Sequence, residues 1–202
     1  MVNEARKQIF LSHAGQDAEF ARRLAARIEC EWTRRQTAYE AHVFCTSEPQ
    51  YRFKDLKQVL RPGSFWRRQV SEWEEELRQY LRQNLIGSAA YVLLVTKQSL
   101  EKHSTWIAFE IDVASEQTKE RQQSFFYPCV AEGATFGELP EKAIRFQAID
   151  LGSDTELDSA EGLAKIRELV TAMIENSNNI SPSPIAPVFL RKIRNWLFRP
   201  RR

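Results

Sequence analysis

The stretch Tyr91-Val-Leu-Leu-Val-Thr96, followed by Ser104-Thr-Trp-Ile-Ala-Phe-Glu110, decides how this 202-residue chain folds. The first segment shows no polar alternation, which is typical of a strand buried on both faces of a parallel sheet. If the second segment is helical, Trp106 and Glu110 lie four residues apart and share one face. An aromatic ring and a carboxylate then follow a buried strand, where open α/β sheets bind ligands. The alternative from spacing alone is a buried Trp106 and a solvated Glu110.

Composition indicates a globular chain with one substantial core, because 43% of the residues are hydrophobic and 28% are charged. No apolar run reaches the roughly 18 to 20 residues of a membrane span, and the first residues do not resemble a secretory signal. The odd number of cysteines and the absence of a CxxC spacing argue against a disulfide framework. Together with three scattered histidines they also argue against a metal site, and we expect a cytoplasmic protein. The residues concerned are Cys30, Cys45, Cys129, His13, His42 and His103.

Charge is unevenly distributed along the chain, whose formal net charge is +2. Residues 188–202 contain six cations and no acid, so the preceding body carries a net charge near −4. A basic tail on a mildly acidic body is not the pattern of a nucleic-acid-binding domain, and we expect no direct nucleic-acid partner. The cations are Arg191, Lys192, Arg194, Arg199, Arg201 and Arg202.

Five short apolar runs alternate with amphipathic helical patterns along the chain. This alternation predicts an α/β fold with a central five-stranded parallel sheet and helices on both faces. Pro128 is expected at the end or on an unpaired side of its strand, because proline cannot donate to a ladder. The predicted strands are residues 8–12, 42–45, 89–96, 125–130 and 146–151.

The chain divides into a domain over residues 1–175, a linker over 176–187 rich in Asn, Ser and Pro, and a basic amphipathic segment over 188–202. The last segment is expected to contact an anionic membrane surface or an acidic patch, or to dock as a helix on the body. Residues 48–63 form a loop longer than the usual βα connection. Aromatic residues flank this loop, so we expect it either to contact a neighbouring copy or to remain a surface loop.

Several of these segments, in this order, resemble bacterial TIR (Toll/interleukin-1 receptor) domains over about residues 7–175. Ile9-Phe-Leu-Ser-His-Ala-Gly-Gln-Asp17 is similar to the family's first strand and loop. Val43-Phe-Cys-Thr-Ser47 and Pro62-Gly-Ser-Phe-Trp66 resemble the second strand and the entry to its helix. Ser104-x-Trp106-x-x-x-Glu110 matches the motif that carries the glutamate of NAD-cleaving members, and Phe126-Tyr-Pro-Cys-Val130 matches the fourth strand.

The resemblance implies a flavodoxin-like TIR fold with Glu110 as the catalytic carboxylate and Trp106 as a wall of the nucleotide site. It further implies that Phe65 stacks on a base or on nicotinamide, and that Thr46 follows the second strand where some relatives carry an acid. The first loop would line the site with Ser12, His13 and Ala14. NAD+ would be the substrate, with no separate cofactor and no metal.

The chemistry that the resemblance implies needs only one carboxylate. Nicotinamide leaves NAD+ as a neutral molecule, so no general acid need protonate it. An anion near the oxocarbenium-like ribose stabilises the developing charge, as carboxylates do in glycosidases. Capture by water gives ADP-ribose, whereas capture by a group within the substrate gives a cyclic product, and both remain open.

The resemblance therefore predicts a hydrolase, an NAD+ nucleosidase that acts in bacterial immune defence after self-assembly, with an upstream sensor or effector as a further partner. A second hypothesis is a TIR domain that binds other TIR domains as a scaffold, without catalysis. A third is another flavodoxin-like nucleotide-binding domain, against which the absence of phosphate-binding glycines argues.

Overall fold

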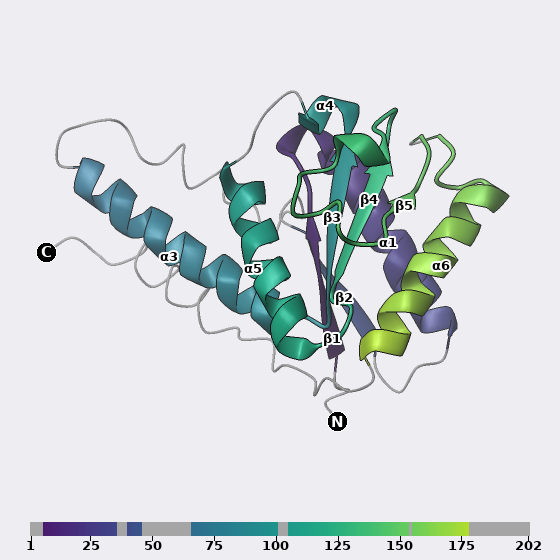
Figure 1. Ribbon diagram of the computed structural model, residues 1–202, viewed down its shortest axis with the longest axis horizontal. Coiled ribbons are helices and arrows are strands. Elements are labelled where there is room, and N and C mark those ends of the chain that lie inside the picture. The colour runs from purple at the N-terminus through teal and green to yellow at the C-terminus, as the bar shows by residue number, and fades with distance from the viewer. Residues whose placement is uncertain (1–5, 36–39, 46–65, 101–104, 154, 178–202) are drawn as a thin grey trace, which may run out of the picture.

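Five parallel strands form a single sheet in the order β2-β1-β3-β4-β5 (Figure 1). The computed structural model describes residues 6–35, 40–45, 66–100, 105–153 and 155–177. The predicted α/β fold with a five-stranded parallel sheet is confirmed. The strands are β1 (Arg6–Ser12), β2 (Glu40–Cys45), β3 (Ala90–Thr96), β4 (Phe126–Ala131) and β5 (Ile149–Asp150).

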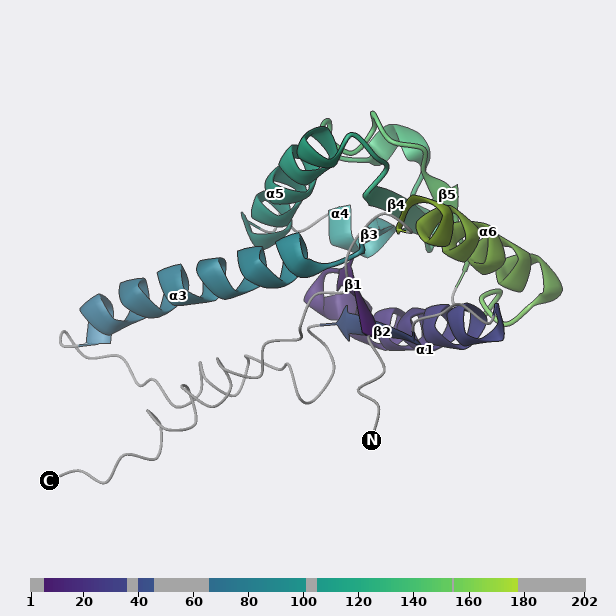
Figure 2. The same ribbon diagram turned by 90° about the horizontal axis from the view of Figure 1, so that it is seen from below.

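Two pairs of helices cover the two faces of the sheet (Figure 2). On one face lie α1 (Ala18–Arg34) and α6 (Ala160–Ser177), and on the other lie α3 (Trp66–Gly87) and α5 (Thr105–Arg121). Among the residues that the structure describes, three short helical segments lie in the connections: η1 (Gly15–Asp17), α4 (Lys97–Leu100) and η3 (Phe136–Glu138).

Alternation along β1 divides the core into two halves. Ile9 and Leu11 are fully buried in the cluster that contains α1 and α6, whereas Phe10 lies in the cluster of α3 and α5. Since successive side chains of a strand point to opposite faces, Ser12 lies on the α3/α5 face with Phe10. The ring centroid of Phe10 is 5.1 Å from that of Phe44 and 5.8 Å from that of Tyr91.

Polar residues at the start of β1 bind the ends of one helix on each face. Lys7 is 3% exposed, and its Nζ donates a hydrogen bond to the carbonyl of Ser177, at the end of α6, over 2.5 Å. Gln8 on the opposite face donates from Nε2 to the Asn84 carbonyl and the Ser88 hydroxyl near the end of α3, each over 3.0 Å. The last carbonyls of a helix have no backbone partner within it, so these bonds help to satisfy the Ser177 and Asn84 carbonyls, the second of which also accepts from the Ser88 hydroxyl over 2.6 Å.

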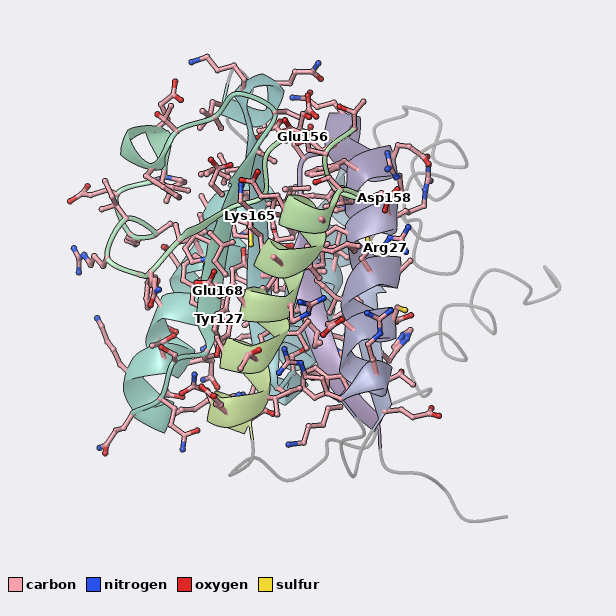
Figure 3. The ribbon with its side chains drawn as sticks, turned by 90° about the vertical axis from the view of Figure 1, so that its right-hand side faces the viewer. Arg27, Tyr127, Glu156, Asp158, Lys165 and Glu168 are labelled. Atoms are coloured by element: carbon pink, nitrogen blue, oxygen red, sulfur yellow. The ribbon has the colours of Figure 1, made fainter. Side chains whose placement is uncertain are left out.

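Figure 3 shows α1 and α6 side by side, with Arg27 of α1 close to Asp158 just before α6. The Asp158 carboxylate accepts bonds from Arg23 over 2.8 Å and from Arg27 over 2.7 Å. The Tyr127 hydroxyl lies on the inner side of α6, within 3.2 Å of the Ala172 carbonyl. These contacts hold the α1/α6 layer together on the face away from Glu110.

Pro128 lies inside β4 rather than at its end, opposite Leu93 of β3. Val130 and Glu132 direct their backbone groups to the β5 side, where they bond Leu151 and Gly152. Pro128 is two residues before Val130 and four before Glu132, so its backbone points to the same side of β4. The pairing with β5 begins only at Cys129. The missing N–H of Pro128 thus faces a side on which β5 has not begun, as expected of a proline in a strand.

Each predicted strand differs from the observed one at an end or at both, and two differences in boundary have a visible cause. The fifth strand covers only Ile149–Asp150 instead of 146–151, because Phe146 closes a helical turn by donating its N–H to the Ala143 carbonyl. Helix α6 continues to Ser177, two residues into the predicted linker, where Lys7 binds its last carbonyl.

The loop 48–63 and the basic segment 188–202 lie outside the described residues. Across the ranges that the structure does describe, no helix combines the length and the apolar character needed to cross a bilayer.

Candidate functional site

A buried serine–glutamate pair lies at the carboxyl end of β1. Ser12 ends β1, and its hydroxyl donates a hydrogen bond to Oε2 of Glu110 in the first half of α5. Ser12 is 2% exposed and Glu110 is 6% exposed. The strand order reverses between β1 and β3, and crevices at such points are where open α/β sheets bind ligands. The predicted site carboxylate therefore lies at the switch point of the sheet.

Burial changes the acidity of Glu110. It raises the pKa of this carboxyl to about 7, because removal from water disfavours the ionised form, and the Ser12 hydrogen bond offsets part of the effect. The neutral form of the carboxyl therefore persists to a higher pH than it does in an exposed glutamate. A nearby positive charge would shift this balance toward the carboxylate.

Tyr91 brings a third polar group to this pair. Its side chain is fully buried, and its hydroxyl makes no hydrogen bond. The ring is held between Phe10 and Phe126, whose centroids are 5.8 and 4.9 Å away. Burial raises the pKa of Tyr91 well above its ordinary value, and the charge of Glu110 raises it further. The nearby Ser12 hydroxyl lowers it in part, although the geometry does not complete a hydrogen bond.

Trp106 contacts α3 rather than Ser12. Its half-buried side chain packs against the cluster of the α3/α5 face. The guanidinium of Arg78 on α3 lies 5.2 Å from the Trp106 ring centroid and 5.3 Å from that of Phe109. The alternative of a buried Trp106 and a solvated Glu110 is wrong, since the carboxylate is the more buried of the two.

A second polar pair lies on the other side of the sheet at the same edge. The Thr96 hydroxyl at the end of β3 donates to Oδ1 of Asp17 over 2.8 Å. Asp17 precedes α1 but makes no side-chain cap hydrogen bond, and its Oδ2 has no hydrogen-bond partner. Burial raises the pKa of Asp17, the Thr96 bond lowers it, and repulsion by Glu132 raises it. This pair joins the loop after β1 to the end of β3.

Of the residues predicted to form the site, Ser12 and Glu110 are brought into contact. His13 and Ala14 follow Ser12, and Nδ1 of His13 donates to the Ala14 carbonyl over 2.7 Å. Thr46 and Phe65 lie outside the described residues. Within the described ranges, no three His, Cys, Asp or Glu side chains come together in a way that could hold a metal ion.

Comparison with solved structures finds a protein with a similar fold. A metazoan TIR-STING receptor from C. gigas, solved in complex with 2′,3′-cGAMP, is similar with a TM-score of 0.50 and 16% sequence identity. This similarity shows that the two chains share a fold. It covers 80% of this chain and 38% of the receptor chain, so this chain spans less than half the length of that protein.

Two oxidoreductases have lower TM-scores of 0.49. One, from Corynebacterium diphtheriae, is 10% identical, with 88% of this chain and 100% of that chain covered. The other, an apo NADH:FMN oxidoreductase, is 7% identical, with 89% and 94% covered. No protein-family model matches the chain. No curated protein matches its sequence.

Sequence reasoning missed Tyr91, Arg78 and the Asp17–Thr96 bond. Tyr91 stands within an apolar run and was included in the strand as a core residue. A tyrosine in such a run carries a hydroxyl that needs a partner when buried, and this was an available signal. No local pattern indicates that Arg78 would meet Trp106, since the contact depends on how α3 crosses α5.

Proposed function

We propose that this protein cleaves NAD+ at the bond between nicotinamide and ribose, with Glu110 as the catalytic carboxylate. The observation that carries the proposal is the buried Ser12–Glu110 pair at the switch point of a sheet with the TIR fold. The matching motif of Trp106 and Glu110 supports it. ADP-ribose or a cyclic ADP-ribose is the expected product.

Each group has a defined part in the proposed reaction. The substrate is cationic at its pyridinium ring, and binding it near Glu110 favours the ionised carboxyl over the neutral form. As nicotinamide departs, the positive charge moves to the ribose, where the carboxylate stabilises it. Little water reaches a carboxylate that is 6% exposed, so this stabilisation is stronger than it would be in solvent. The Ser12 hydroxyl holds one carboxylate oxygen in place.

The experiment that tests the proposal is nicotinamide release from NAD+ by the wild type and by Glu110→Gln, at matched concentration and under crowding. The variant keeps size and hydrogen bonding but loses the charge, so kcat should fall about a hundredfold or more. Glu116→Gln is the matched control, because Glu116 lies on the same helix and forms an exposed ion pair with Arg82. Its activity should equal that of the wild type.

Two outcomes would contradict this assignment. If Glu110→Gln releases nicotinamide as fast as the wild type, Glu110 is not the catalytic group. If the wild type releases none, even under crowding, a non-catalytic scaffold that binds other TIR domains becomes the better hypothesis. The buried Ser12–Glu110 hydrogen bond would then be a contact that fixes α5 to β1.

We further propose that the active form is an assembly of copies of this chain. What supports this is the TIR fold together with the long aromatic loop 48–63, which lies outside the described residues. Antiviral defence under an upstream sensor is the expected setting. The six cations of residues 188–202 are proposed to contact an anionic membrane surface, and equal sedimentation with anionic and neutral vesicles would exclude this.

A further inference from the structure

We propose that Tyr91 is a positioning residue for Glu110, whose hydroxyl becomes the second hydrogen-bond donor to the Glu110 carboxylate when that group is ionised. The catalytic consequence rests on the function proposed above. The hydrogen bond itself does not, and it can be measured without NAD+. The inference begins with a buried hydroxyl that lacks a partner.

A buried polar atom without a hydrogen bond is uncommon in proteins and needs an explanation. The Tyr91 hydroxyl is such an atom, on a side chain that is 0% exposed. Phe10 and Phe126 hold the ring on either side, so the hydroxyl cannot turn away to solvent. A hydroxyl that is held in this way can form hydrogen bonds only with the groups that already surround it.

Ser12 and its partner Glu110 lie on the same α3/α5 face as the Tyr91 ring, which pairs with Phe10, two residues before Ser12 in β1. Both affect the pKa of Tyr91, the first by its hydroxyl and the second by its charge. Ser12 already donates its one proton to Glu110 Oε2, so it has none to give to Tyr91. A carboxylate accepts several hydrogen bonds, whereas a neutral carboxyl must also place its own proton. Ionisation of Glu110 therefore turns a weak acceptor into a strong one for the Tyr91 hydroxyl, because hydrogen bonds to a carboxylate are stronger than those to a neutral carboxyl or hydroxyl.

Charged groups on the neighbouring elements do not take this place. From β1 comes the neutral Ser12, and from β3 comes Tyr91 itself. Helix α3 brings Arg78, which lies over the rings of Trp106 and Phe109. Asp17 points to Thr96 on the other side of the sheet. Among the described residues, Tyr91 is thus the one that can donate the second hydrogen bond to the ionised Glu110 carboxylate.

The test is the pKa of Glu110, followed by NMR of carboxyl-labelled glutamate in the intact protein. Tyr91→Phe removes only the hydroxyl, and that hydroxyl has no partner to lose, so the variant should fold. It should raise the Glu110 pKa by about one unit, the size of one hydrogen bond to a charged group. Tyr127→Phe is the control, because its hydroxyl is bound on the α6 side.

A second comparison tests the same hydrogen bond in the absence of the Ser12 donor. In a Ser12→Ala background, Tyr91 is the remaining donor, so adding Tyr91→Phe should raise the Glu110 pKa further. An unchanged pKa in both comparisons, or an equal shift in Tyr127→Phe, would overturn the proposal.

Activity is the second readout. In Tyr91→Phe, the rise of kcat/KM with pH should move up by the same unit, while KM at high pH stays unchanged. If the NMR shift is found but no variant cleaves NAD+, the proposed function fails and the role of Tyr91 in holding Glu110 stands. If NAD+ is cleaved but the pH profile of Tyr91→Phe does not move, the proposed function stands and the role of Tyr91 fails.

Discussion

The guanidinium of Arg78 on α3 lies over the indole ring of Trp106 on α5, 5.2 Å from the ring centroid. The same guanidinium lies 5.3 Å from the ring of Phe109, so one exposed cation covers two aromatic residues that are three positions apart. Trp106 is therefore positioned by a helix that begins far earlier in the chain. The position of Trp106 therefore depends on its contact with α3, and the position of Glu110 depends on its hydrogen bond to Ser12 of β1.

Removal of this cation should loosen α5 against α3. Arg78→Ala is expected to lower the free energy of unfolding by about 1 kcal/mol, the size of an exposed cation–π contact. Arg82→Ala, one turn further along α3, breaks only an exposed 3.5 Å ion pair with Glu116 and should cost less than about 0.5 kcal/mol. Urea denaturation measures both values. Equal losses in the two variants would show that the aromatic contact contributes nothing of its own.

Burial of Glu110 should make the protein less stable as pH rises. The pKa of this carboxyl is about 7 in the folded protein, against an ordinary value of 4.5. The unfolded chain releases this proton more readily, so the contribution of Glu110 to folding stability is greatest below pH 4.5 and is lost as pH rises to about 7. The loss is on the order of 3 kcal/mol. Glu110→Gln carries no charge and should escape it.

The measurement is the melting temperature of the wild type and of Glu110→Gln between pH 5 and pH 8. The variant should gain stability relative to the wild type across this range, with the difference largest at pH 8. Glu116→Gln should show no such trend, because its carboxylate is exposed. A constant difference between the wild type and Glu110→Gln would mean that burial does not control this carboxyl.

Lys7 should hold the last turn of α6. Its charged Nζ donates to the Ser177 carbonyl, where a cation also interacts favourably with the helix dipole. Lys7→Met keeps the apolar stem and should cost about 1 kcal/mol, since relief from burying the charge offsets part of the lost bond. Amide exchange in the last turn of α6 should accelerate, whereas the exposed Lys119→Met should leave it unchanged.

Assembly predicts how activity depends on concentration. If the site is complete only between copies, activity should rise more than linearly as the protein is concentrated, so specific activity should increase, because the competent state is only partly populated in the monomer. Nicotinamide release over a hundredfold dilution measures this. Flat specific activity would argue against assembly and leave the loop 48–63 as a surface loop.

The sequence alone was sufficient to predict the sheet and the approximate position of each of its strands. Apolar runs without alternation and helical periodicity are local patterns, and they identified all five strands and the helices that cover them. Its errors lie at boundaries, where Phe146 entered a turn and α6 extended to Ser177. These outcomes depend on contacts with distant residues, such as Lys7, that no local pattern contains.

The candidate site likewise depends in part on the sequence and in part on contacts between distant residues. Sequence spacing singled out Glu110, and the family resemblance added Ser12, but the hydrogen bond between them joins residues 98 positions apart. It exists because the order β2-β1-β3-β4-β5 brings the end of β1 beside β3 and under α5. The burial that raises the pKa of Glu110 and leaves Tyr91 without a partner arises from the packing of α5 on that sheet. The sequence was enough to name Glu110 as the candidate carboxylate. Its pKa was decided by the tertiary structure, because desolvation depends on everything that surrounds a group.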